Sequence, residues 1–451
     1  MFERFVEKSP ISVMARGTME RILNPEQLNE WFDKTAQKQY TRELLFSSIF
    51  DIMSQVVFDK HHSVNAAYQA SEEDIAVSVT SVYNKLNGIE ANTSAEMVRY
   101  AAGEIIPVIE ELKGAVAPLL PGFHIKLLDG NCIEATEHRI KELRDNGAGA
   151  LPGKSLVVYD PSLRIPIDVF PCEDGHAQER SLLGNVLGTV KANDVWINDR
   201  NFCVRSFLCG IADKKAYFIN RLHENLPWES LGKEKYCGKT ETGKVYEQPI
   251  LVVDESGKEW KFRVIRVCLK KSTRDGDKEI FIITNLSKSA AHAKMIADLY
   301  RKRWKIETVF QELTEHLNSE INTLGYPPAA LFGFCVALVS YMVLSVVKAA
   351  LSSEYGAERI DNEVSGYYLS DEISGTYRGM IIAIRDEEWE EFRDLSQSQF
   401  VTLLKQLARN VKLSRFRKHP RGPKKPVPKR KFDPKHPHVS TAKLLEGRKK
   451  R

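Results

Sequence analysis

"LYRKRWKIETVFQEL", residues 299–313, reads as an amphipathic helix whose two flanks differ in chemistry. At about 100° per residue, Tyr300, Arg303, Trp304 and Glu307 share one flank. The neighbouring flank is an apolar stripe of Leu299, Ile306, Phe310, Leu313 and Leu317. The pattern predicts one helix that packs against a core and holds a polar, chemically capable group at its margin.

The composition is that of a globular chain. With 451 residues, 43% of them hydrophobic, the chain can bury a large core in several structural units, which excludes disorder throughout. Its seven cysteines are an odd number without a C-x-x-C pair, which argues against a disulfide framework and a structural zinc site. The first residues, "MFERFVEKSPISVMARG", show no secretory pattern, so we expect a cytoplasmic protein with reduced thiols.

One uncharged segment, residues 329–347, is about long enough to cross a bilayer. Two serines, a tyrosine and a preceding Pro-Pro pair favour a buried core helix over a membrane span. We therefore expect no membrane partner.

The C-terminal end is strongly basic. Residues 412–451 carry 16 Lys or Arg against two acids, which leaves the preceding residues net acidic although the whole chain is +5. The proline-rich stretch at 418–438 is expected to be an extended cationic strip able to lie along phosphates, and a solvated tail without a ligand is the alternative. The candidate DNA-binding residues here are Arg417, Lys418, Arg421, Lys424 and Lys425.

Strand-like runs alternate with helical ones after residue 120, which predicts a mixed α/β sheet with flanking helices. Within the helical first part, residues 72–89 suggest a short helix pair, either a helix-turn-helix or a bundle corner. The expected segments are a helical N-terminal domain at 1–119, an α/β domain at 120–221 and 279–352, an inserted β subdomain at 222–278, a helical region at 353–411 and the basic tail at 412–451.

Three acids occupy settings that suit metal binding. Asp129 ends the apolar strand "FHIKLLD", Asp199 ends "VWIND", and Glu307 lies on the helix described above. Each alone is weak, because such acids are often turn formers, helix caps or solvated. Two carboxylates at strand ends and a third from a facing helix can nevertheless converge on hard divalent cations. Asp168, inside a predicted strand, is expected to face solvent.

The neighbours of Glu307 suit contacts with nucleic acid. Arg303 can bind a phosphate through two hydrogen bonds, and Tyr300 can donate to a phosphate oxygen. Trp304 can stack on an unpaired base, or it packs the helix onto the sheet as a rim contact. A loose phosphate-loop match at residues 148–155 is set aside, because a strand rather than a helix follows it.

"YRKRWKIE" resembles the Tyr-x2-Arg-x3-Glu signature of DDE transposases of the insertion-sequence family numbered four. "LLDG" and "INDRNF" resemble the two aspartate strands of that family, "ITNL" the strand before its signature helix, and "HVSTAKLL" its C-terminal end. The resemblance implies a ribonuclease-H-like fold interrupted by an inserted β subdomain. It departs at Thr314, where the signature has a lysine, and Gln311 is expected to share its phosphate contact.

The resemblance implies a DNA transposase in which Asp129, Asp199 and Glu307 hold two Mg²⁺ ions, with Mn²⁺ as a substitute. It would cleave strands at transposon ends and transfer the 3′-hydroxyl to target DNA, as a homodimer in a synaptic complex on terminal inverted repeats. We expect it at the bacterial nucleoid. The alternatives are a catalytically impaired or non-catalytic DNA-binding protein, which the missing lysine favours, and a structure-specific Mg²⁺-dependent nuclease.

Overall fold

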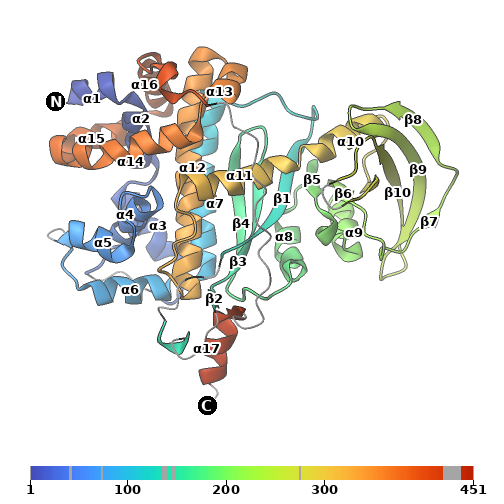
Figure 1. The fold of residues 1–451 in the computed structure, drawn as a ribbon, viewed down its shortest axis with the longest axis horizontal. Coiled ribbons are helices and arrows are strands. Elements are labelled where there is room, and N and C mark those ends of the chain that lie inside the picture. The colour runs from blue at the N-terminus through green and yellow to red at the C-terminus, as the bar shows by residue number, and fades with distance from the viewer. Residues whose placement is uncertain are drawn as a thin grey trace.

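A ten-stranded mixed sheet lies beside a thick helical layer in the computed structural model (Figure 1). The structure describes residues 2–39, 43–72, 75–134, 136, 140–143, 149–273, 276–419 and 438–449. The strand order is β4-β3-β1-β5-β6-β11-β10-β9-β7, with β8 paired to β9. The strands are β1 (His124–Cys132), β3 (Lys154–Asp160), β4 (Ile165–Cys172), β5 (Asp194–Asn198), β6 (Tyr217–Arg221), β7 (Glu229–Ser230), β8 (Lys235–Lys239), β9 (Gly243–Val253), β10 (Glu259–Leu269) and β11 (Glu279–Thr284).

The centre of this sheet is parallel and its flanks are antiparallel. β1 pairs in parallel with β5, and β5 pairs in parallel with β6. β3 and β4 continue the sheet on one side and β11 on the other, all in antiparallel pairs. Both faces of the central strands are buried, as expected for strands rich in Val, Ile and Leu. The predicted mixed α/β sheet with flanking helices is confirmed.

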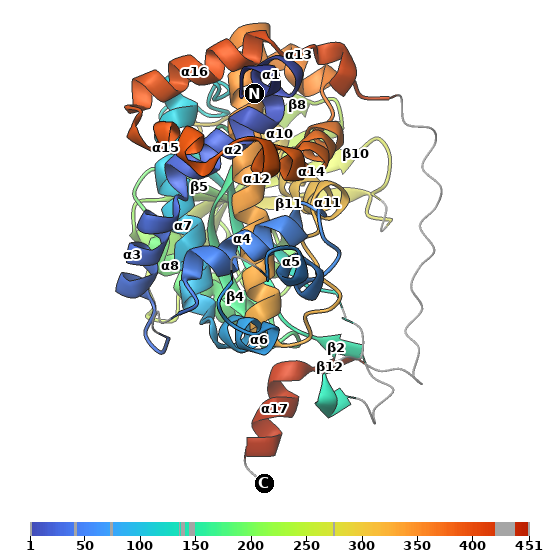
Figure 2. The same ribbon diagram turned by 90° about the vertical axis from the view of Figure 1, so that its left-hand side faces the viewer.

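Helices from both ends of the chain form the helical layer. α7 and α12 run side by side against β4, and the C-terminal helices pack on α2 (Figures 1 and 2). The N-terminal helices are α1 (Phe2–Lys8), α2 (Pro10–Ile22), α3 (Pro25–Thr35), α4 (Phe46–Val57), α5 (Val64–Ala70), α6 (Val79–Gly88) and α7 (Ala91–Glu111). The C-terminal ones are α12 (Pro327–Tyr355), α13 (Ala357–Glu363), α14 (Gly366–Ala383), α15 (Asp386–Asp394) and α16 (Gln397–Arg409). Within 72–89 the structure has the helix α6, and residues 73–74, at the start of the expected helix pair, lie outside the described residues.

The apolar segment at 329–347 lies inside α12. Among the described residues, α12 is the one helix that is long and apolar enough to cross a membrane, and its most apolar part is entirely buried in the fold. The expectation of a buried core helix is confirmed. The opposite face of the sheet is covered by α8 (Leu183–Thr189) and α9 (Arg205–Asp213).

The predicted single helix at 299–313 is wrong in one respect. It is divided into α10 (Ala293–Arg301) and α11 (Trp304–His316), and residues 302–303 form a turn between them. Bonds three residues apart replace the α-helical ones there, with the Arg303 N–H donating to Tyr300 at 3.0 Å and the Ile306 N–H to Arg303 at 3.1 Å. The apolar stripe is buried as predicted, with Phe310 only partly covered.

The segment at 222–278 is made of strands, as expected, but they lengthen the central sheet. β10 pairs with β11 along six residues, and β11 pairs with β6, so β7 to β10 continue the sheet outward (Figure 1). The prediction that Asp168 faces solvent is also wrong. Its side chain is buried and pairs with the guanidinium of Arg99 on α7, with Arg99 Nε 2.6 Å from Asp168 Oδ1.

The structure describes only residues 418, 419 and 438 of the predicted extended strip. Residues 438–449, the described end of the basic tail, form β12 (His438–Ser440) and α17 (Thr441–Lys449). β12 pairs in parallel with β2 (Gly149–Leu151), and Lys443 Nζ lies 2.8 Å from Asp174 Oδ2. Residues 420–437, which carry most of the predicted strip, lie outside the described residues.

Candidate active site

Asp129 and Asp199 come from neighbouring parallel strands. β1 and β5 pair with Leu128 opposite Asn198, so each aspartate is the next residue along its strand. Paired strands lie about 4.8 Å apart. Side chains two residues earlier on both strands belong to the core cluster that includes α11, which puts the two carboxylates on the sheet face that α11 crosses.

Arg303 and Tyr300 connect these aspartates to Glu307. Arg303 Nη1 lies 2.8 Å from Asp129 Oδ2, and Arg303 Nη2 lies 2.6 Å from Glu307 Oε1. The Tyr300 hydroxyl donates to Asp199 Oδ1 at 3.3 Å. Burial and the neighbouring Asp199 raise the pKa of Tyr300, so its hydroxyl stays protonated as a donor. Acids far apart in the sequence thus meet in one hydrogen-bonded network.

The network is partly withdrawn from water, and its charges are strongly coupled. The pKa of Asp129 is raised to about 7, and burial is the largest cause. Arg303 and the Gly130 N–H, which donates to Asp129 Oδ1 at 2.9 Å, lower this pKa in part. Glu307 and Asp199 raise it further by repulsion. Burial alone would lower the pKa of Arg303, but the surrounding acids raise it, so the guanidinium remains charged.

The donor chemistry of the three acids fits a hard divalent cation, which prefers carboxylate oxygens. The repulsion felt by Asp129 supports that fit, because it marks negative charge in excess of what Arg303 neutralises. In the arrangement that the described residues adopt, no three His, Cys, Asp or Glu side chains are grouped closely enough to hold a metal ion. Arg303 instead bridges Asp129 and Glu307.

Trp304 begins α11 beside this network, and 62% of its surface is exposed. It borders an apolar cavity of about 240 Å³. The other residues that line this cavity are Thr242, Val267, Leu269, Ile280, Ile282, Ala297, Tyr300, Arg301 and Arg303. A flat apolar guest can enter between the indole and the ends of β10 and β11.

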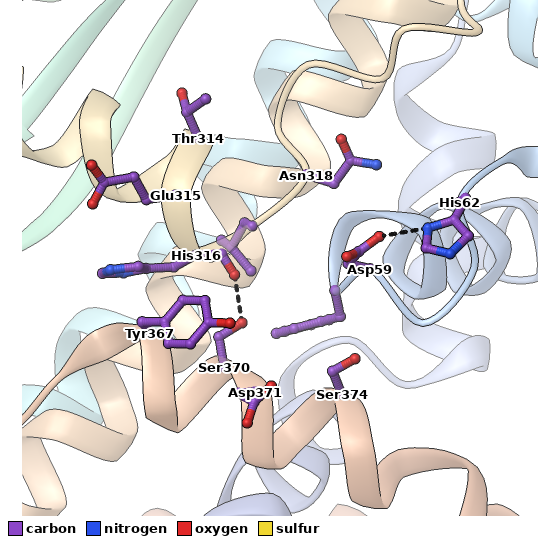
Figure 3. A pocket seen from close by; sticks show the side chains of 12 residues that line it. Asp59, His62, Thr314, Glu315, His316, Asn318, Tyr367, Ser370, Asp371 and Ser374 are labelled. Atoms are coloured by element: carbon purple, nitrogen blue, oxygen red, sulfur yellow. Dashed lines mark hydrogen bonds and ion pairs between the residues drawn. The ribbon is translucent and has the colours of Figure 1, made fainter.

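Gln311 and Thr314 lie farther along α11, and both are exposed. Their side-chain hydrogen bonds stay within the helix, since Gln311 donates to Glu315 and Thr314 Oγ1 donates to the Phe310 carbonyl at 3.0 Å. Thr314 borders a separate cavity of about 390 Å³, with Asp59 on the far side (Figure 3). The structure therefore does not join these two residues to the carboxylate network.

Two of the predicted tail residues are described. Arg417 follows the 3₁₀ helix η5 (Leu413–Phe416), and the Lys418 N–H donates to the Glu363 carbonyl at 2.6 Å. Both lie beside α13. Arg421, Lys424 and Lys425 lie outside the described residues.

Several supporting residues escaped sequence reasoning. Glu179 packs so closely over Gly130 that a Cβ there would lie 2.1 Å from its Oε1. Asn201 Nδ2 donates to the other oxygen of Glu179 at 2.6 Å, and Asn220 Nδ2 donates to the Asp199 carbonyl at 3.1 Å. Only the glycine directly after Asp129 signals such a close approach in the sequence. The asparagines and Glu179 carry no signal of their own.

Known proteins resemble this chain over the same region. Residues 123–341 match the family model described as "Transposase DDE domain". The putative transposase y4zB of Sinorhizobium fredii is 25% identical over 197 residues, which are 43% of this chain and 52% of that protein. The putative transposase InsL of insertion sequence IS186A and the transposase of IS421, both from Escherichia coli, are 20% identical over 53% of this chain and 70% of theirs.

The match thus spans about half the length of y4zB. Among solved structures, a piggyBac transposase synaptic complex with hairpin DNA aligns with 86% of each chain at 10% identity and a TM-score of 0.39.

Proposed function

We propose that this chain is an insertion-sequence DDE transposase, and that it cuts DNA strands at the ends of a mobile element and joins them to target DNA. The observation that carries the proposal is the convergence of Asp129, Asp199 and Glu307 on one face of the sheet through Arg303 and Tyr300. Membership of the family numbered four is part of the proposal and rests on the Tyr-x2-Arg-x3-Glu spacing.

Asp129, Asp199 and Glu307 would hold two Mg²⁺ ions, or Mn²⁺ in their place. When bound, such ions supply Lewis acidity toward phosphoryl groups. Without bound ions, Arg303 keeps Asp129 and Glu307 close to one another, because its guanidinium forms an ion pair with each of them. Tyr300 fixes the orientation of Asp199 through its hydroxyl. Water would first attack the phosphodiester at the transposon end and break its P–O3′ bond, which leaves a 3′-hydroxyl and a 5′-phosphate. That 3′-hydroxyl would then attack a phosphodiester of the target strand, form a new P–O bond and displace the 3′-oxygen of the target as a hydroxyl.

Contacts with DNA would extend from this network along α11. Arg303 can exchange one carboxylate for a phosphate, since its planar fork suits both. Trp304 would stack on an unpaired base whose edge enters the adjoining apolar cavity. Gln311 and Thr314 would touch the backbone farther along, where a threonine hydroxyl replaces the signature ammonium group.

The assembly and location belong to the same proposal. The DNA partners would be the terminal inverted repeats and the target duplex, held by a homodimer in a synaptic complex. The N-terminal helices of residues 1–119 would read the repeats, residues 120–221 and 279–352 would carry the chemistry, and the basic residues after 412 would bind backbone. Such a protein would work at the nucleoid in the bacterial cytoplasm.

A catalytically impaired DNA-binding protein is the second candidate. Two observations favour it: Thr314 stands where the signature has a lysine, and Arg303 forms hydrogen bonds with Asp129 and Glu307. A supercoiled plasmid that carries the sequences flanking the gene, incubated with and without Mg²⁺, separates the candidates. A transposase nicks the ends and joins strands, a nuclease nicks without joining, and an impaired protein retards the DNA without cutting it.

A further inference from the structure

A polar groove runs along the flank of α11 that faces away from the carboxylates. Two cavities, of about 250 and 480 Å³, make up this groove. They are continuous because Thr308, Glu312, Lys348 and Asp361 line both. Its walls come from α11, α12, α13 and the turn between β3 and β4.

Lys305 supplies an unpaired cation at one end of this groove. No side chain among those that the structure describes hydrogen-bonds to its ammonium group or forms an ion pair with it. The positive charges of Lys302 and Arg164 repel this ammonium group, and the carboxylate of Asp361 attracts it. Arg164 itself is held by Asp361 through two hydrogen bonds of 2.6 Å. Two cations, Lys305 and Arg164, therefore line this end of the groove, and Asp361 binds one of them.

Cations also line the middle and the far end, beside the acids Glu312, Glu315 and Asp361. Lys348 Nζ lies 3.6 Å from Glu312 Oε2, and Lys418 and His419 line the outer wall. Burial alone would raise the pKa of Glu312, yet that pKa is lowered, with Lys348 and His316 as the leading causes. The deepest acid of the groove is thus more than compensated by its surroundings. Residues 1–411 are net acidic as a whole, so a polyanion can bind there only where cations gather locally.

We propose that this groove binds the phosphodiester backbone of the DNA strand opposite the one in the active site. The inference rests on the proposed function and locates its substrate. An α-helix with its side chains is about 10–12 Å across and a B-DNA major groove is about 12 Å wide, so α11 fits between two backbones. Its exposed crest carries Trp304, Thr308 and Gln311. One backbone then reaches the carboxylates, and the other reaches Lys305 and Lys348.

Salt-dependent binding of a fluorescent duplex of mixed sequence tests the groove. The logarithm of the affinity falls with the logarithm of salt concentration in proportion to the number of phosphates neutralised. Replacing Lys305 with alanine should lower that slope by about 1 and weaken binding similarly for all sequences. Lys305→Arg should retain the slope. Lys214→Ala, which removes an exposed lysine after α9 on the opposite face of the sheet, should change nothing.

Lys305→Glu should weaken binding more than Lys305→Ala does, and melting temperatures identify any variant that fails to fold. If wild-type protein cleaves DNA with Mg²⁺ while folded Lys305→Ala and Lys305→Glu keep the wild-type slope, the groove does not bind backbone and the proposed function stands. If wild-type protein neither binds nor cuts DNA, the proposed function fails and the groove inference fails with it.

Discussion

Arg303 shows how one residue serves the whole site. Its guanidinium joins Asp129 on a strand to Glu307 on a helix. Helical periodicity predicted that Arg303 and Glu307 share a flank, because that follows from spacing alone. The pairing with Asp129, 174 residues away in the chain, depends on how α11 crosses the sheet and could not be predicted from spacing.

Asp129 should make the stability of the cation-free protein depend on pH. Its pKa is about 7 in the folded chain against an ordinary value of 3.8, so its contribution is fully present below about 4 and is lost as the pH rises through 7. Urea denaturation in a chelator, at a series of pH values, should therefore show the free energy of unfolding falling over that window. Asp129→Asn should remove this component of the curve, and identical curves for both proteins would refute the assignment.

Trp304 should matter for DNA far more than for folding. An exposed side chain contributes little to stability, so Trp304→Ala should change the free energy of unfolding by no more than about 0.5 kcal/mol. Loss of a stacked base should weaken binding of a duplex with an unpaired terminal base by about 1–3 kcal/mol. Trp304→Phe should retain most of that affinity, measured by fluorescence anisotropy. Equal affinity of the alanine variant for paired and frayed ends would argue against stacking.

At the level of elements, the turn between α10 and α11 was invisible in the sequence. Residues 299–313 contain neither glycine nor proline, and every residue there tolerates a helix. The turn is a tertiary effect, since Tyr300 at the end of α10 reaches Asp199 while Arg303 reaches Asp129. The strands of the insert were predictable from composition. Their continuation of the central sheet was not, because edge pairing leaves no local pattern.

Arg99 ties α7 to the edge strand β4, and breaking this tie should be costly. Its side chain contacts Asp168 Oδ1 at 2.6 Å and donates to the Val169 carbonyl at 3.3 Å. Asp168→Ala leaves the half-buried guanidinium with Glu96 as its remaining acid, which should lower the free energy of unfolding by about 1–3 kcal/mol. Chemical denaturation measures this, with the exposed Asp213→Ala as the control. A wild-type midpoint for Asp168→Ala would mean that water replaces the pair.

For the whole molecule, the joint packing of both chain ends was the least predictable feature. Sequence periodicity gave separate helices before and after the sheet, but α12 packs against α2, α4, α7 and α16 at once. A buried helix that is apolar on all sides has no single apolar face, so its sequence does not indicate which elements pack against it. The position of the chain's end could not be predicted for the same reason. Residues 438–440 pair with β2, a strand nearly three hundred residues earlier in the sequence.

The basic residues between positions 419 and 438 should increase the affinity for DNA without affecting the fold. Truncation after 411 would also remove the buried Leu413 and Phe416, so charge removal is the cleaner change. Serine at Arg421, Lys424 and Lys425 should lower the salt slope of duplex binding by about 0.9 for each phosphate that is no longer neutralised. Anisotropy at several salt concentrations measures it. An unchanged slope at unchanged melting temperature would mean that the tail is merely solvated.

The rate of strand cleavage at the element's ends, measured with Mg²⁺ for wild type and for Asp129→Ala, Asp199→Ala and Glu307→Ala, tests the carboxylate site most directly. Each substitution should slow cleavage about a thousandfold or more, because several kcal/mol of transition-state stabilisation are lost, while duplex binding persists. Near-normal cleavage by any one of the three variants would contradict the account and remove that residue from the site.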